Sequence, residues 1–177
     1  MGDLRAASTP ALALLVARGV PHTVHEYEIE GPSGPEARRG ARVAYGTAAA
    51  AALGVPPERL YKTLVIALEG GRATDGELAL AVLPSSAELS ERAAAAALGA
   101  KRATLASTEA VERATGSVPG GVSPVGTRRA MRTLIDASAE GHAEILVSAG
   151  RRGLSVALAP QDLLTLCRAN YASLCEG

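Results

Sequence analysis

Hydrophobic and polar positions along this chain predict short helices that alternate with strands. Thr9 is a helix-capping residue and Pro10 suits a first turn, so a first helix is expected to end at Gly19. Capping serines, alanine-rich runs and terminal glycines predict the other helices, at residues 48–53, 90–99, 107–116 and after Pro160. The last helix is expected to include both cysteines, Cys167 and Cys175.

Apolar runs rich in β-branched residues predict the strands, at residues 22–27, 60–68, 77–83, 133–136, 144–148 and 154–158. A glycine-containing connection joins the second and third of these, so they are expected to pair antiparallel. Residues 30–42 hold two Pro, three Gly and three Arg, which predicts a polar loop. The chain is thus expected to be one α+β domain over residues 1–177, with a mixed, mainly antiparallel sheet.

Composition favours a soluble protein with an aliphatic core. Phe and Trp are absent, so any aromatic wall of a binding site must come from the four tyrosines, Tyr27, Tyr45, Tyr61 and Tyr171. No apolar run is long enough to span a membrane and the N-terminus lacks a secretory pattern, which predicts a cytoplasmic location. The 18 basic and 18 acidic residues balance, which argues against a large nucleic-acid-binding surface.

The cysteines and histidines give no sign of a metal or redox site. Eight residues separate Cys167 from Cys175, about 12 Å along one helix, which is beyond disulfide reach, so free thiols are expected. His22, His25 and His142 lack metal-ligand spacing. Neither a metal nor another cofactor is therefore expected.

Two stretches suggest chemistry. Lys62 interrupts the apolar run 60–66, and its ammonium must reach a pocket or an anion, because an unpaired buried charge is costly. Gly120 and Gly121 begin a loop whose backbone N–H groups could meet negative charge. A cation and a donor-rich loop suit an ester or phosphate substrate. A phosphate-binding P-loop is disfavoured, since Thr127 stands where its lysine is required, and Pro124 disfavours a nucleophile elbow.

These stretches, Leu60–Ile66 and Gly120–Gly126, together with Val147–Leu154, resemble in order and spacing the YbaK/ProX family of free-standing aminoacyl-tRNA editing domains. The resemblance is closest to the Cys-tRNA(Pro) deacylases and extends from Thr9 to the helix after Pro160. It implies a curved sheet flanked by helices. It also implies a pocket between the lysine strand, the glycine loop and the Ser-Ala-Gly turn at residues 148–150.

The resemblance further implies that mischarged tRNA(Pro) is hydrolysed at the ester of its acceptor end. Lys62 and Gly120 match the family's catalytic positions, Lys62 as an anchor for the acceptor end. The N–H groups of Gly120 and Gly121 are candidate donors to the ester carbonyl. In the YbaK branch the thiol of the substrate cysteine attacks its own ester, so no protein nucleophile is needed.

Other positions are expected to bind substrate: Tyr27, Tyr45, Thr63, Gly121, Ser148, Gly150 and Ser155. Tyr45 replaces a family Phe, and Ser155 replaces an Asp that would meet the substrate's amino group. Thr63 is equally well explained by core packing.

Three arginines that follow the glycine loop, Arg128, Arg129 and Arg132, are expected to contact tRNA phosphates. The segment 30–42 is about nine residues longer than in YbaK proteins and could dock on prolyl-tRNA synthetase. Two alternative functions remain open. One is a weakened family member that binds tRNA or a small ligand as an accessory module. The other is a deacylase for Ala or Ser.

Overall fold

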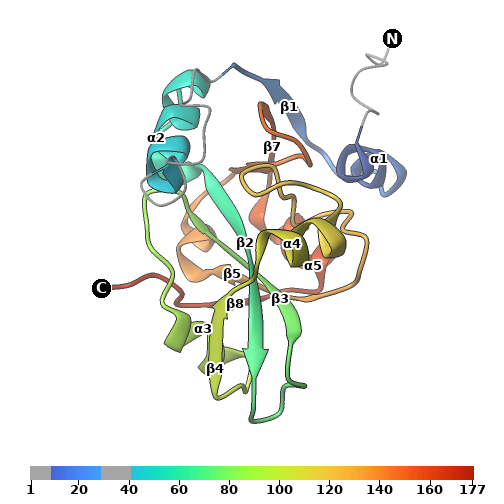
Figure 1. Cartoon of the computed structure of the whole chain (residues 1–177). Coiled ribbons are helices and arrows are strands. Elements are labelled where there is room, and N and C mark those ends of the chain that lie inside the picture. The colour runs from blue at the N-terminus through green and yellow to red at the C-terminus, as the bar shows by residue number, and fades with distance from the viewer. Residues whose placement is uncertain (1–8, 29–40) are drawn as a thin grey trace.

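The computed structural model describes residues 9–28 and 41–177, and only the backbone of residues 41–45. Its helices are α1 (Pro10–Ala17), α2 (Ala41–Leu53), α3 (Glu91–Ala97), α4 (Thr108–Thr115) and α5 (Pro160–Cys167). Its strands are β1 (Thr23–Glu26), β2 (Tyr61–Glu69), β3 (Glu77–Pro84), β4 (Arg102–Leu105), β5 (Arg132–Asp136), β6 (Ile145–Ser148), β7 (Leu154–Leu158) and β8 (Asn170–Ala172). Figure 1 shows β2 and β3 at the centre of the molecule, with helices around them.

The strands form two sheets that meet at one point. A five-stranded sheet has the order β4-β2-β3-β5-β8, and a three-stranded sheet has the order β1-β7-β6. The pairs β2–β3, β2–β4, β1–β7 and β6–β7 are antiparallel, whereas β3–β5 and β5–β8 are parallel. A parallel bridge between Leu60 and Leu146 joins the two sheets. The predicted α+β fold with a mixed, mainly antiparallel arrangement is confirmed.

Helices bury both faces of each sheet, as the apolar positions require. Buried side chains of the five-stranded sheet, such as Ile66 and Leu68, pack with Ala94 and Ala95 of α3. The opposite face packs on α4 and the glycine loop. The three-stranded sheet has α1 and α5 on one face and α2 on the other. The candidate site lies on the face that α2 covers.

Side-chain caps explain where three of the predicted helices begin. Thr9 accepts a hydrogen bond from the N–H of Leu12, and Ser90 and Ser107 do the same for the residues three positions on. Each bond satisfies a backbone donor that the first helical turn leaves open. The sequence prediction is confirmed for α1, α3 and α4.

Helix α2 begins earlier than predicted. Its range includes Ala41 and Arg42, which were expected to end a loop; the rest of that segment lies outside the described residues. Gly46, which precedes the predicted start at residue 48, lies within α2, and a Cβ there would come 2.7 Å from the Cβ of Ser85. Close packing against the segment after β3 thus explains a glycine that propensity disfavours.

The C-terminal prediction was wrong. Helix α5 ends at Cys167, where Arg168 adopts a left-handed conformation with φ of 49°, and the chain continues as β8. Cys175 lies beyond that strand and bridges to Leu89. Both thiols are free, as expected. Strand β4 was also missed, because it has only four residues and begins at a basic residue, Arg102.

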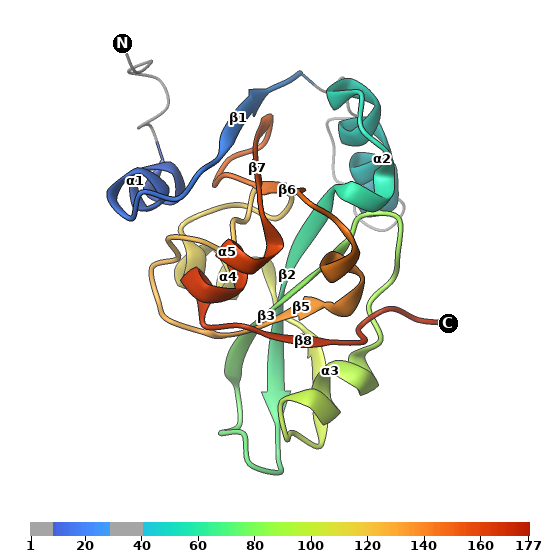
Figure 2. The same cartoon turned by 180° about the vertical axis from the view of Figure 1, so that it is seen from behind.

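A buried carboxylate ties the C-terminal segment to the core. Asp136, 5% exposed, accepts hydrogen bonds from the Ser138 hydroxyl at 2.5 Å and the Leu174 N–H at 2.8 Å. Because the Ser138 proton is used in this way, the Tyr61 hydroxyl donates to Ser138 Oγ, at 2.8 Å. Figure 2 shows β8 crossing the back of the molecule toward the C-terminus. The segment after β8 is therefore part of the folded domain.

Across the described ranges 9–28 and 41–177, no helix is both long and apolar enough to cross a membrane.

Candidate functional site

Residues from four strands share one side of the sheets. Strand register pairs His25 with Ser155 and Ser155 with Ser148. A parallel bridge joins Leu60 to Leu146. Two residues further along the chain from each of them come Lys62 and Ser148, whose side chains therefore lie on the same side as those of Leu60 and Leu146. We call Lys62, Ser148, Ser155 and His25 the polar row. Three of its members were expected to contact substrate, and the topology aligns them from distant parts of the chain.

An apolar row lies beside the polar row. It consists of Leu60, Leu146 and Ala157, which pack against Ala49 and Ala50 of α2. Burial of these side chains positions the strands against the helix. The change from apolar to polar residues from Leu60 to Lys62, from Leu146 to Ser148 and from Ala157 to Ser155 indicates a site rather than further core.

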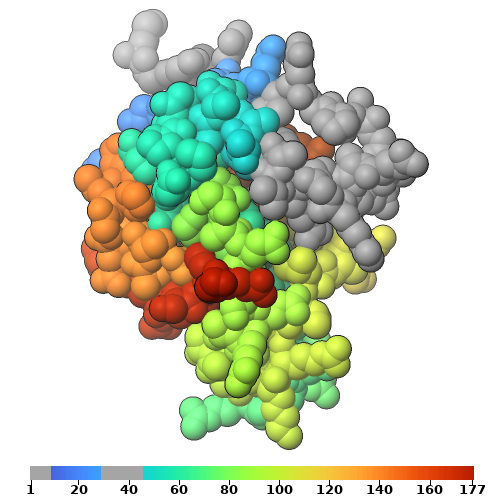
Figure 3. Space-filling model, turned by 90° about the vertical axis from the view of Figure 1, so that its left-hand side faces the viewer, coloured from blue at the N-terminus to red at the C-terminus, as the bar shows by residue number. Residues whose placement is uncertain are grey.

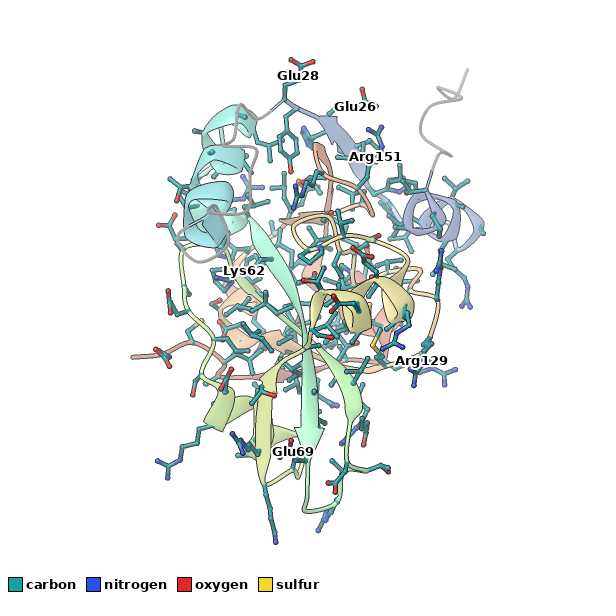
Figure 4. The ribbon with its side chains drawn as sticks, in the orientation of Figure 1. Glu26, Glu28, Lys62, Glu69, Arg129 and Arg151 are labelled. Carbon is teal, nitrogen blue, oxygen red and sulfur yellow. The ribbon has the colours of Figure 1, made fainter. Side chains whose placement is uncertain are left out.

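Lys62 lies beside β2 on the side where α2 lies, as Figure 4 shows. Its ammonium donates to the backbone carbonyl of Ala87, at 2.5 Å. That carbonyl belongs to the loop after β3, so the fold directs the lysine toward this loop. The side chain is only partly buried. A carbonyl is a neutral partner, so this hydrogen bond does not itself neutralise the positive charge of Lys62.

Ser155 is 1% exposed, and its hydroxyl lies 3.2 Å from the Tyr27 hydroxyl. Tyr27 also donates its N–H to the Gly153 carbonyl. The structure therefore brings together two predicted substrate-binding residues that are 128 positions apart. In the Ser-Ala-Gly turn, Ser148 Oγ accepts the N–H of Gly150 at 3.4 Å.

The glycine loop docks on the turn at residues 150–153. A Cβ on Gly121 would come 2.9 Å from the Arg152 nitrogen and 3.0 Å from the Arg151 carbonyl carbon, so only glycine allows this approach. The Arg152 guanidinium donates twice to the Pro119 carbonyl, at 2.8 and 3.2 Å. Two of the three sequence motifs thus form one packed unit.

The two loop glycines differ in their backbone donors. The N–H of Gly121 donates to the Val118 carbonyl at 2.9 Å, which closes a turn and removes Gly121 as a donor to substrate. Within the described part of the chain, the N–H of Gly120 has no hydrogen-bond acceptor. Gly120 is exposed and has φ of 90°. Of the two candidate donors to the ester carbonyl, Gly120 remains.

Thr63 faces the other side of β2, away from the polar row. Its neighbours on that side are Tyr61 and Val65, both buried. Its hydroxyl oxygen is buried without a hydrogen-bond partner. An unpaired buried hydroxyl is uncommon in a core, so its part in substrate contact stays a prediction. Tyr45 is in α2, where only the backbone is described.

The three arginines after the glycine loop have different surroundings. Arg128 lies against Gly116 at the end of α4, and Arg129 is exposed at the edge of the molecule in Figure 4. Arg132 instead pairs with the Glu77 carboxylate at 2.8 Å and holds the pKa of that group below its usual value. Its role in tRNA binding stays a prediction, and Arg128 and Arg129 are better placed for it.

A pocket of about 130 Å³ lies at the start of α1, lined by Pro10, Ala11, Gly126, Arg128 and Gly150, among others. Two of the three expected walls contribute to it, the glycine loop and the Ser-Ala-Gly turn. Lys62 does not line it. The hydroxyls of two lining residues, Ser117 and Ser123, form intramolecular hydrogen bonds. No residue of the polar row lines this pocket.

The cysteines do not supply a nucleophile. Burial raises the pKa of Cys167 to about 12, and burial followed by the nearby Asp136 carboxylate raises that of Cys175 to about 11. Both thiols are therefore protonated near neutral pH, whereas the reactive form is the thiolate. Among the described residues, no three His, Cys, Asp or Glu side chains form a possible metal site.

Similarity to known proteins defines the chain as an ester hydrolase that deacylates aminoacyl-tRNA. The chain belongs to the aminoacyl-tRNA editing domain family, whose family model matches residues 43–166. It is 34% identical over 125 residues to EbsC of Enterococcus faecalis (strain ATCC 700802 / V583), provisionally named a Cys-tRNA(Pro)/Cys-tRNA(Cys) deacylase. That match covers 71% of this chain and 73% of EbsC.

Solved structures share the fold over its full length. One, provisionally described as a trans-editing enzyme for prolyl-tRNA synthetase, is 25% identical, with a TM-score of 0.75 and complete coverage of both chains. Another comes from work on grafting linear epitopes onto scaffold proteins. It is 23% identical, with a TM-score of 0.77 and 99% of both chains covered, and supports the fold alone.

Two residues of this site escaped the sequence analysis. His25 was considered only as a metal ligand, although its partner in register is Ser155. Arg152 was included only as part of the stretch Val147–Leu154, although it binds the peptide at the start of the glycine loop. Both relations join segments more than 30 residues apart, and a single sequence carries no local signal for either.

The two loop glycines should respond differently to alanine. Gly120→Ala adds a Cβ whose nearest neighbour is the flexible Arg152 side chain, at 3.2 Å, but strains a backbone with φ of 90°. We expect about a 10²-fold loss of turnover with a small change in Tm. In Gly121→Ala the new Cβ would clash with the backbone of Arg151 and Arg152, so this change should lower both turnover and Tm. Equal losses of turnover and Tm in Gly120→Ala would show that Gly120 is structural.

Proposed function

We propose that this protein is a trans-editing hydrolase that removes cysteine from Cys-tRNA(Pro) and so protects the fidelity of translation. The observation that carries the proposal is the alignment of Lys62, Ser148 and Ser155 in one polar row. The docked glycine loop, with the open N–H of Gly120, adds a donor for the ester carbonyl.

Editing is needed because a synthetase pocket for proline excludes small amino acids poorly. A small missing or altered group changes binding by only about 1–3 kcal/mol. A second site that hydrolyses the wrong ester supplies the remaining discrimination. We place this reaction in the cytoplasm, with prolyl-tRNA synthetase as the source of the mischarged tRNA.

In the proposed reaction, the thiol sulfur of the esterified cysteine attacks its own carbonyl carbon. The carbonyl oxygen gains negative charge, which the Gly120 N–H stabilises. The bond to the ribose oxygen then breaks, that oxygen takes up a proton, and the amino acid leaves as a cyclic thioester that water can open. Lys62 holds the acceptor end through its phosphate or hydroxyl groups, with its neutral Ala87 contact as the resting partner.

The test is a deacylation assay with tRNA(Pro) charged with Cys, Ala or Ser. Release of cysteine well above the uncatalysed rate is expected. Preferential release of Ala or Ser would overturn the cysteine assignment and leave a deacylase for another small amino acid. Binding of tRNA without release of any of the three would favour an accessory module, a reading that the neutral Ser155 supports.

Ser155→Asp is expected to raise kcat/KM for Cys-tRNA(Pro) severalfold. A carboxylate here would meet the substrate's ammonium, and such a charge-assisted hydrogen bond is roughly twice as strong as a neutral one. Although the position is buried, the Tyr27 hydroxyl can donate to the new carboxylate. Ser155→Asn is the neutral control and should bring no gain. Unchanged or lower kcat/KM in a folded Ser155→Asp variant would exclude this position from amino-group recognition.

A further inference from the structure

The peptide between Pro119 and Gly120 carries the candidate donor of the site. In a trans peptide the carbonyl and the next N–H point in opposite directions from one rigid plane, and the described residues contain no cis peptide. Whatever fixes the Pro119 carbonyl therefore also fixes the direction of the Gly120 N–H.

Arg152 fixes that carbonyl. Its Nη2 and Nε both donate to the Pro119 oxygen, at 2.8 and 3.2 Å. The planar guanidinium presents these donors as a rigid fork, which a lysine cannot reproduce. The same side chain occupies the space next to the Cα of Gly120, where a Cβ would come 3.2 Å from Nε.

The contact also changes the donor strength of the peptide. A positive charge beside the carbonyl oxygen polarises the amide, and linked hydrogen bonds strengthen one another by about 10–30%. The Gly120 N–H, which has no intramolecular acceptor in the described structure, receives this effect and faces away from the guanidinium.

We propose that Arg152 is a positioning residue, which orients and polarises the Pro119–Gly120 peptide so that the Gly120 N–H can stabilise the negative charge on the ester carbonyl. This inference rests on the proposed deacylase function. It differs from a role in tRNA binding, in which Arg152 would contact a phosphate directly. The two roles predict different kinetics.

The first experiment compares Arg152→Met and Arg152→Lys with the wild-type protein in the Cys-tRNA(Pro) assay. Arg152→Met should lower kcat about 10–100-fold with KM and Tm nearly unchanged, since misplacement of a catalytic group by about 1 Å has effects of this size. The kcat of Arg152→Lys should lie between those of Arg152→Met and the wild-type protein. Arg102→Met is the matched control, because Arg102 is exposed and lies beside Glu69, far from the site.

Two further measurements separate positioning from other roles. In Arg152→Ala, millimolar guanidinium should restore part of kcat by occupying the vacated space. Combining Arg152→Met with Gly120→Ala should cost little more than Gly120→Ala alone, because both changes affect one donor.

The proposal is overturned if kcat of Arg152→Met stays within twofold of wild type. It is also overturned if KM rises instead and the slope of log KM against log salt decreases by about one, which is the signature of a lost phosphate contact. Additive losses in the double variant would likewise contradict it. A wild-type protein that releases no amino acid would overturn the proposed function, and this inference with it.

Discussion

Lys62→Ala should reduce kcat/KM for Cys-tRNA(Pro) by about 10²–10³-fold while the domain stays folded. The proposed acceptor-end anion would lose its charged partner in a partly covered site, and loss of such a partner costs about 2–5 kcal/mol. Stability should change little, because Lys62 is only partly buried and its ammonium donates to a backbone carbonyl, that of Ala87 in the loop after β3.

The chain offers a matched control for this change. Lys101 is the only other lysine of the sequence, and it is exposed. Lys101→Ala should keep the wild-type rate, and Lys62→Met, which retains most of the apolar stem, should be as inactive as Lys62→Ala. A Lys62→Ala protein with near wild-type turnover would end the assignment of Lys62 as the anchor.

Asp136→Ala should destabilise the domain by about 3 kcal/mol or more. The substitution leaves the buried N–H of Leu174 and the partly buried hydroxyl of Ser138 without their acceptor, and each hydrogen bond to a charged group contributes about 1.5–3 kcal/mol. Urea unfolding measures the loss. Asp75→Ala, at an exposed carboxylate that accepts one backbone bond, is the control and should cost far less. A loss below about 1 kcal/mol would contradict the prediction.

The same carboxylate predicts a pH dependence. Burial alone would raise the pKa of Asp136, but hydrogen bonds from Ser138 and Leu174 outweigh burial and hold this pKa below its ordinary value of 3.8. Its contribution to stability is therefore complete above the unfolded-state pKa and declines as the pH falls through the lower folded-state pKa. Asp136→Asn should remove this acid-dependent part of the unfolding free energy.

Local patterns predicted most elements of the fold, because capping residues and strand periodicity act over a few positions. Thr9, Ser90 and Ser107 each begin a helix as expected. The secondary-structure prediction failed where contact with a distant segment determines the local structure. Helix α2 begins before the predicted residue 48 and includes Gly46, which packs closely on Ser85, and β8 pairs with the edge of β5.

The candidate site was likewise only partly predictable from the sequence. The resemblance to a family identified Lys62, Gly120 and Ser155, but not how their strands are aligned. Register between β1, β7 and β6 places His25 beside Ser155, and no pattern within either strand contains that pairing. The availability of Gly120 and not Gly121 as a donor likewise depends on one turn closed by Val118.

The loop that holds Lys62 is itself fastened by the last part of the chain. Ser90 donates its N–H to the Leu174 carbonyl, and Glu176 donates to the Glu88 carbonyl, on either side of the bridge between Leu89 and Cys175. In the space-filling view of Figure 3, α2, the segment after β3 and the C-terminal residues lie side by side.

This arrangement sets an order of events on the ribosome. Domains begin to fold during synthesis, in the order in which their segments emerge. Strand β2 is made early, but the loop around Ala87 is fastened only when residues 174–176 have left the exit tunnel, more than 100 residues later. The Ala87 loop of a growing chain therefore lacks these two backbone hydrogen bonds until residues 174–176 have emerged.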